Sequence, residues 1–259
     1  MQNLFMAWLA WPVFMVFASL FAAYVGAAVL IVWLSFRSPF APWIQSFKGI
    51  VAPFFGSTAI IFGVLVAFLS NDIWDRNKQA ERVVLTESDT LVALYSLSVA
   101  SGTDSRGLRT AIRAYASAVV NDEWPRLALE ERSAKTEAAL NALLHEVAQP
   151  GGTKDAGVQR TMLDMALKIR SAHEDRVQLS QNRSAVTKWT TVLLLALITQ
   201  VAIAIVHLER PRPQAAALLI FTVGAVSLLG LLAVHEAPFE PPIFVPPGPI
   251  AKVLSQVPM

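Results

Sequence analysis

Four long stretches of the sequence contain no charged side chain, and they restrict the possible folds more than any other feature. They cover residues 1–36, 49–71, 189–208 and 213–235. A helix needs about 20 apolar residues, at about 1.5 Å per residue, to cross about 30 Å of hydrocarbon. Each stretch is long enough, and within lipid only a helix satisfies the backbone hydrogen bonds of a single segment. The sequence therefore predicts an all-α integral membrane protein with four transmembrane helices.

The charged side chains are concentrated between the second and third apolar stretches. The chain has 21 basic and 19 acidic residues, and 16 of each lie within residues 72–188. A polar region of this size could not bury four apolar helices, so we prefer the membrane interpretation to buried core helices. We predict transmembrane helices 1 and 2 in residues 1–71, a cytoplasmic helical bundle in 72–188, transmembrane helices 3 and 4 in 189–235, and an extended, proline-rich tail in 236–259. The balanced charge argues against nucleic acid as a partner.

Glycine and proline positions indicate where the helices begin and end. Neither residue interrupts 64–101, so we expect the second transmembrane helix to continue into water as one rod. Another helix is expected over about 126–148, and one from about Asp155 is expected to run without a break into the third transmembrane helix. The seven prolines after His235 predict that the tail is extended and not helical.

The orientation in the membrane follows from the basic residues that flank the apolar segments. Four crossings place both termini and the polar domain on one side. The basic residues near the membrane on that side are Arg76, Lys78, Arg82, Arg176, Arg183, Lys188 and Lys252. Those on the other side are Arg37, Lys48, Arg210 and Arg212. The positive-inside rule therefore predicts a multi-pass protein of the cell inner (plasma) membrane whose termini and helical domain are cytoplasmic.

The sequence contains no set of residues suited to catalysis, and none suited to a cofactor or a metal. It has no cysteine, and its four histidines are far apart. It also lacks a phosphate-binding glycine loop and a Gly-x-Ser-x-Gly turn. The side chains of His173-Glu174-Asp175 point in different directions around a helix, so we expect a solvated face. We interpret Asp122-Glu123 with Glu130-Glu131 in the same way. The sequence therefore gives no support for an enzymatic function.

The second membrane helix carries the most informative apolar pattern. Ile60, Val64 and Phe68 are four residues apart and share one helical face. In a single copy this face would contact lipid or another helix, whereas in a symmetric ring it would form stacked apolar collars around an axis. No membrane segment contains Asp, Glu, Lys or Arg, which argues against a proton pump or an ion-coupled transporter. A passive pore with an apolar constriction remains possible.

The end of the second membrane helix resembles a signature of the bestrophin anion channels, close to Phe-Arg-x-Asn-x-x-Tyr-Asp-Arg-Trp. The matching residues are Phe68, Asn71, Asp75 and Arg76, together with Ala80, which matches an alanine that follows the signature. Trp74 replaces the signature tyrosine with another aromatic residue, whereas Leu69 replaces its arginine and Asn77 its tryptophan. This local resemblance suggests a distant relationship to the bestrophins.

A broader resemblance, over nearly the full length, is to the bacterial bestrophin-like family. Its further markers here are Tyr115, Val119, Glu123-Trp124-Pro125 and Pro238-Phe239. The resemblance implies a homo-oligomer, as a pentamer, with a central anion pathway in a bacterial inner membrane. It also implies a narrow neck of three apolar residues on the second helix, which correspond to Ile60, Val64 and Phe68. The clustered acidic loop with which animal bestrophins bind calcium has no equivalent here.

We therefore hypothesise a passive anion channel of the chloride type, formed by a homo-oligomer in the lipid bilayer. Ile60, Val64 and Phe68 would form its apolar neck. The residues expected just below this neck are Asn71, Trp74, Asp75 and Arg76. Of these, Asp75 and Arg76 are expected to brace neighbouring helices and not to contact ions. The alternative is a membrane-anchored helical scaffold without transport activity, whose proline-rich tail docks a partner.

Overall fold

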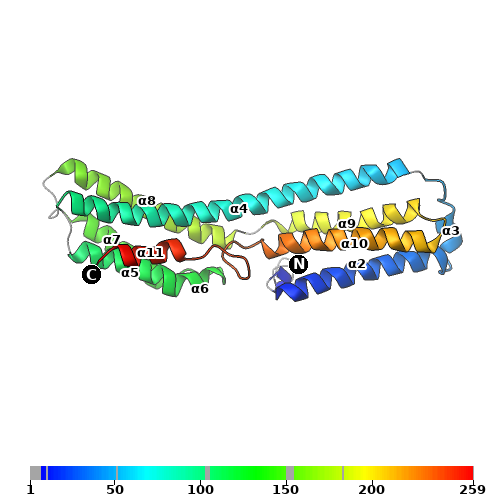
Figure 1. Cartoon of the computed structure of the whole chain (residues 1–259), viewed down its shortest axis with the longest axis horizontal. Helices are drawn as coiled ribbons and strands as arrows, with labels where there is room; N and C mark the ends of the chain where they lie inside the picture. Colours follow the sequence, from blue (N-terminus) through cyan, green and yellow to red (C-terminus); the bar gives the residue numbers. More distant parts are fainter. Residues whose placement is uncertain are drawn as a thin grey trace. The chain divides into compact units, whose positions relative to one another are not determined.

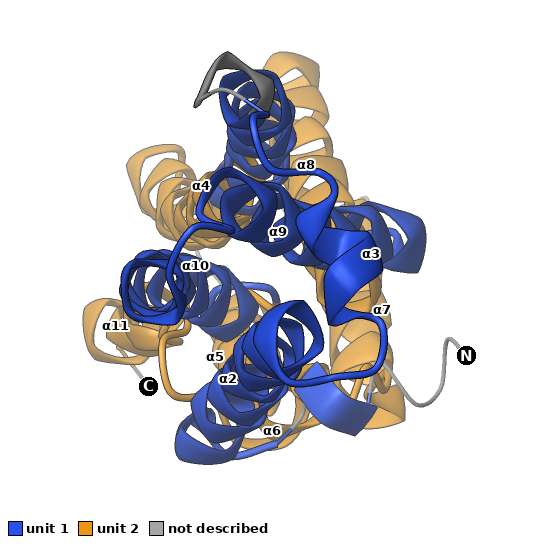
Figure 2. Cartoon of the chain, turned by 90° about the vertical axis from the view of Figure 1, so that its right-hand side faces the viewer, with its two compact units in different colours: residues 1–74, 184–236 blue, residues 75–183, 237–259 orange. Residues whose placement is uncertain are grey.

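The regular secondary structure of the described residues is entirely helical. The computed structural model describes residues 7–9, 11–50, 52–102, 106–149, 155–182 and 184–258, without the side chains of 52–54. Four of its helices are long and apolar enough to cross a membrane. The predicted all-α class with four candidate transmembrane helices is thereby confirmed. The chain divides into two compact units, 1–74 with 184–236 and 75–183 with 237–259, which Figure 2 colours separately.

The first unit contains the apolar helices. They are α2 (Val13–Phe36), α9 (Val186–Val206), α10 (Pro211–Val234) and the N-terminal part of α4 (Ala52–Ala100), together with the short α3 (Ala41–Gln45) (Figure 1). Helices α2 and α10 have 24 residues each, so each is about 36 Å long and can cross the hydrocarbon core. Pro12 precedes α2 and Pro211 opens α10. Proline suits a helix start because the first N–H groups have no partner within the helix.

Buried polar side chains connect three helices of the first unit. The Gln200 amide donates to the Tyr24 carbonyl at 3.1 Å and to the Thr222 hydroxyl at 2.8 Å. The Tyr24 hydroxyl donates to the Leu193 carbonyl at 3.0 Å. Interhelical hydrogen bonds of this kind are worth roughly 1 kcal/mol each within a membrane. They fix the mutual rotation of α2, α9 and α10.

Helix α4 is a single helix of 49 residues, and it continues past the membrane segment as the absence of glycine and proline from 64–101 predicted. One face is buried at intervals of three or four residues from Phe62 to Ser98, except for a seven-residue gap between Ile73 and Ala80. The buried positions are Phe62, Val66, Leu69, Ile73, Ala80, Val84, Glu87, Leu91, Leu94 and Ser98. The helix ends at Ala100, and Gly102 follows with φ of 70°, which suits glycine. The sequence offers Asp104 or Ser105 as a cap for the next helix, and both lie outside the described residues.

The second unit is a bundle of shorter helices around one apolar core. Its elements besides the C-terminal part of α4 are α5 (Arg106–Ala118), the π-helical turn η1 (Val119–Glu123), α6 (Trp124–Leu127), α7 (Ala134–Ala148), α8 (Ala156–Gln181) and α11 (Gly248–Gln256). Leu91, Ile112, Leu143 and Ile169 are fully buried in this core and come from four different helices. The amphipathic faces of these helices therefore meet within one layer of apolar side chains.

Two expected helices are shorter than predicted. The helix expected over 126–148 begins only at Ala134, because the Ser133 hydroxyl caps it by accepting from the Thr136 N–H at 3.0 Å. The helix expected to run unbroken from Asp155 into the membrane ends at Gln181, and α9 begins at Val186. Within the gap, the Ser184 N–H donates to the Glu236 carboxylate at 2.5 Å. Because the Ser184 N–H is used in this bond, it does not take part in the backbone hydrogen bonding of a helix.

The prediction of a wholly extended tail was also wrong. The segment begins with proline-rich irregular structure but ends in the nine-residue helix α11. Pro249 lies in the first turn of this helix, where proline is tolerated. Ile250, Val253 and Val257 are fully buried in the core of the second unit. The Arg113 guanidinium donates to two carbonyls at the end of α11, which satisfies groups that a helix end leaves open.

Candidate functional site

The predicted neck residues form an exposed apolar stripe on α4. The exposed fractions of Ile60, Val64 and Phe68 are 67%, 48% and 65%. On the opposite face of the same segment, Val66 and Leu69 are buried in the core of the first unit. The stripe therefore does not contribute to the protomer's own core. It is available to contact lipid or another copy of the chain.

A groove beside Phe68 ends in a pair of opposite charges. It has a volume of about 430 Å³ and is lined by Leu65, Phe68, Leu69, Asp72, Thr187, Lys188, Thr191 and Val192. Asp72 is the first ionisable residue after the stripe, and its carboxylate forms an ion pair with the Lys188 ammonium group of α9. The first acidic charge after the stripe is therefore balanced within the protomer.

The signature residues after the stripe occupy the next two turns of α4. Asn71 and Asp75 are exposed, and Arg76 is half-buried. Trp74 is 39% exposed, and its ring centroid lies 4.7 Å from that of His235 in the same unit. Their place below a pore and the bracing role of Asp75 and Arg76 stay predictions.

The family markers of the second unit converge on its core. Tyr115 and Val119 are fully buried, and Glu123 is buried at the end of the π-helical turn. The Trp124 ring packs edge-on against Phe239, with centroids 5.6 Å apart and planes at 90°. The markers that lie far apart in the sequence therefore meet in one place.

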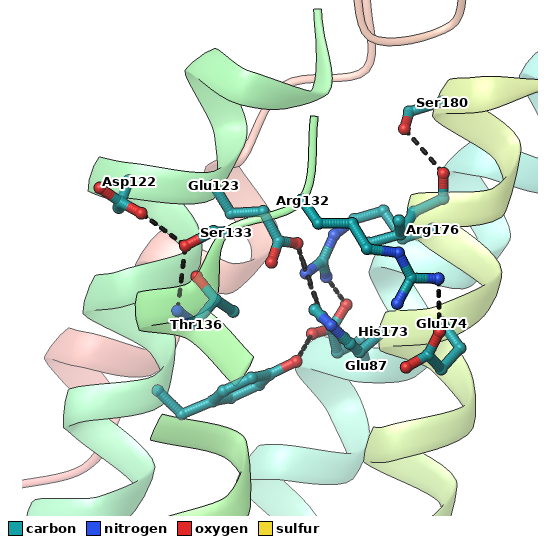
Figure 3. A network of polar contacts seen from close by, with 12 residues as sticks. Glu87, Asp122, Glu123, Arg132, Ser133, Thr136, His173, Glu174, Arg176 and Ser180 are labelled. Carbon is teal, nitrogen blue, oxygen red and sulfur yellow. Dashed lines mark hydrogen bonds and ion pairs between the residues drawn. The ribbon is translucent and has the colours of Figure 1, made fainter. Parts of the chain in front are cut away.

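A cluster of charged side chains lies at the centre of these residues (Figure 3). The Arg176 guanidinium of α8 is fully buried and forms ion pairs with Glu87 of α4 and Glu123 of η1. The Tyr115 hydroxyl donates to Glu87. The Nδ1 atom of His173 lies 3.2 Å from Arg176 Nη2 and 3.5 Å from Glu123 Oε1. We call these five residues the buried charge cluster.

The family is decided by comparison with known proteins. A bestrophin-like domain matches residues 22–250. The chain belongs to the bestrophin-like family. No curated protein matches its sequence.

Solved structures show the same fold for this bestrophin-like protein. A crystal structure of a bacterial bestrophin homologue from Klebsiella pneumoniae is 13% identical, with a TM-score of 0.67 over 93% of this chain and 96% of that chain. A single-residue variant of that homologue is 12% identical, with a TM-score of 0.69 over 93% of this chain and 97% of that chain. The shared fold therefore includes both units of the bestrophin-like chain.

The buried charge cluster corrects two sequence interpretations of this bestrophin-like chain. His173 and Glu123 do not lie on solvated faces, because both are buried. Glu87 and Arg176 were not identified as site residues at all. The sequence did contain a sign that Glu87 is buried. Glu87 lies three residues after Val84 and four before Leu91, on the same apolar face of the helix. The residues that the structure describes include no group of three His, Asp or Glu side chains able to hold a metal ion.

The cluster contains two carboxylates and only one guanidinium. Burial raises the pKa of Glu123 to about 8, although the nearby Thr136 hydroxyl and the charge of Arg132 act in the opposite direction. One guanidinium can neutralise one carboxylate, and Glu87 also accepts a hydrogen bond from Tyr115. Glu123 is therefore the carboxyl group that holds a proton at neutral pH.

The raised pKa of Glu123 predicts a pH-dependent stability. A carboxyl whose folded pKa exceeds its ordinary value binds its proton more tightly in the folded state. The contribution of the Glu123 proton to the free energy of unfolding is full below pH 4.5 and is lost as the pH rises through about 8. We expect the melting temperature of the detergent-solubilised protein to fall over that window, and Glu123→Gln to flatten the fall. The matched exposed variant Glu81→Gln should keep the wild-type slope, and an unchanged slope in Glu123→Gln would contradict the assignment.

Proposed function

We propose that this bestrophin-like protein is a passive anion channel of the chloride type, formed by a homo-oligomer. The observation that carries the proposal is the apolar stripe of α4. Ile60, Val64 and Phe68 project from the protomer while the other side of the helix packs inside it. A ring of copies around a shared axis would turn the stripe into three stacked apolar collars.

Apolar collars suit a passive pathway. Water leaves a narrow hydrophobic constriction readily, so such a neck opens or closes by small changes in width. The stripe contains no ionisable side chain, and the first acidic residue after it, Asp72, is paired with Lys188. A passing anion therefore meets neither a strong trap nor a fixed negative charge in the neck.

The remaining parts of the proposal extend the same arrangement. The oligomer is a pentamer in a bacterial inner membrane, with the termini and the helical bundle in the cytoplasm. Asn71 and Trp74 lie directly below the neck, and Asp75 and Arg76 brace neighbouring helices there. The buried charge cluster stabilises the cytoplasmic bundle. It does not line the pathway, because its members are buried within one unit.

Chloride flux from proteoliposomes tests the proposal. The full-length protein, first shown to be oligomeric by native mass spectrometry, is reconstituted with chloride inside, and efflux is started by a potassium ionophore. We expect efflux that depends on the protein and that requires no proton or sodium gradient. Vesicles without protein provide the baseline. Verified oligomers that give only baseline efflux would favour the alternative of a helical scaffold.

A further inference from the structure

An apolar groove lies between α2 and α10 of the membrane unit. It has a volume of about 430 Å³ and is lined by Val25, Ala28, Val29, Val32, Trp33, Phe36, Arg37, Ala215, Leu219 and Thr222. The two helices are in close contact elsewhere, at Gly230, where an added Cβ would lie 2.4 Å from the Phe17 ring. Away from that contact, the small side chains of Ala28 and Ala215 leave the space between the helices unfilled.

The interior of the groove offers no polar group to an occupant. Besides Arg37, its polar side-chain groups are the Trp33 indole N–H, one turn before Arg37, and the Thr222 hydroxyl, which already accepts a hydrogen bond from Gln200. The remaining lining is aliphatic or aromatic. Binding in the groove is favoured by burial of apolar surface on the occupant and is disfavoured by burial of an unpaired polar group.

The dimensions of the groove suit one hydrocarbon chain. Val25 and Arg37 mark its ends on α2, so at about 1.5 Å per residue it is about 18 Å long. This is roughly the depth of one leaflet of a bilayer whose hydrocarbon core is about 30 Å thick. A volume of 430 Å³ over that length gives a cross-section of roughly 24 Å². A helix is about 10 Å across, so this cross-section suits an acyl chain better than a helix of another copy.

The outer end of the groove is suited to a phosphate group. Arg37 follows the last residue of α2 and is exposed. No salt bridge or side-chain hydrogen bond of the described residues involves its guanidinium, and Arg212 adds a second exposed positive charge in the first turn of α10. Trp33 lies one turn before Arg37, where an aromatic ring marks the membrane interface. Arginine binds phosphate oxygens through paired hydrogen bonds.

We infer that the groove between α2 and α10 is a binding site for one anionic phospholipid. Its acyl chain lies along Ala28, Val32 and Leu219, and its phosphate contacts Arg37. The site is separate from the proposed pore, because it is formed by α2 and α10 and not by α4. It would exist whether or not the protein conducts ions.

Native mass spectrometry of the full-length oligomer, titrated with phosphatidylglycerol or phosphatidylcholine, tests the headgroup contact. We expect one tightly retained phosphatidylglycerol per protomer, bound in preference to phosphatidylcholine. Arg37→Gln should weaken phosphatidylglycerol binding about fivefold, as expected for one basic residue at an anionic lipid surface, and should leave phosphatidylcholine unchanged. Lys48→Gln removes an exposed charge that does not line the groove, so it should bind as the wild type does. Equal binding of both lipids by the wild type would overturn the inference.

A second pair of variants tests the acyl-chain contact. Ala215→Trp fills the groove and should abolish tight retention of the lipid. Ala216→Trp places the same side chain at the neighbouring exposed position and should retain it. Unchanged retention in Ala215→Trp would overturn the inference. A changed number of protomers in Ala215→Trp alone would overturn it as well, because the groove would then be a contact between copies.

Discussion

Replacing Arg176 with methionine will lower the free energy of unfolding by about 3–5 kcal/mol, the usual cost of removing one partner of a buried ion pair. Arg176 is fully buried and is the ion-pair partner of both Glu87 and Glu123. Without it, the Glu87 carboxylate either stays charged in the core or must take up a proton. The measurement is chemical denaturation of the full-length protein in detergent, followed by circular dichroism.

A surface pair provides the matched control for this substitution. Arg132 forms a 3.1 Å ion pair with Glu174, and both side chains are exposed. Arg132→Met should therefore cost about 1 kcal/mol or less, because water screens exposed pairs. Adding Glu87→Gln to Arg176→Met should recover part of the stability by removing the orphaned charge. A loss in Arg176→Met no larger than in Arg132→Met would contradict the assigned role of the cluster.

Shortening the apolar collars will increase the conductance severalfold. Val64→Ala and Phe68→Ala each remove apolar bulk from a stripe that projects from the protomer. If this stripe surrounds the pathway, the constriction becomes wider and retains water more readily. Phe68→Ala should have the larger effect because phenylalanine has the larger side chain. The measurement is single-channel recording of the reconstituted oligomer in planar bilayers.

The control for the collar variants is another exposed apolar residue in the membrane. Ile220 of α10 is 75% exposed and lies outside the stripe. Ile220→Ala should leave the single-channel conductance unchanged. Equal conductance in the wild type, Val64→Ala and Phe68→Ala would show that these side chains do not form the narrowest part of the pathway.

The membrane fold could be predicted because its cause is local to each segment. Charge-free stretches of sufficient length can only be helices in lipid, whatever surrounds them. The continuation of helix α4 beyond the membrane segment was predictable for a similar reason, since neither glycine nor proline occurs in 64–101. The stripe of Ile60, Val64 and Phe68 was likewise visible from its spacing alone.

The errors concern contacts between residues that are distant in the sequence. The break between α8 and α9 depends on Glu236, which accepts from the Ser184 N–H. Glu123 of η1 is buried against Arg176 of α8, and His173 of α8 is buried against Glu123 and Tyr115 of other helices. Helix α11 depends on the core of the second unit, which buries Ile250 and Val253. Spacing within one helix shows which residues share a face but not which distant residues cover it.

Blockade by a thiol reagent most directly tests whether the α4 stripe faces a shared axis. The natural chain has no cysteine, so Val64→Cys introduces a single target for a bulky, water-soluble methanethiosulfonate, and Ile220→Cys introduces a control. Our proposal predicts that the reagent abolishes chloride current in Val64→Cys and leaves the current of Ile220→Cys intact. Full current in Val64→Cys after mass spectrometry has shown complete modification would contradict it.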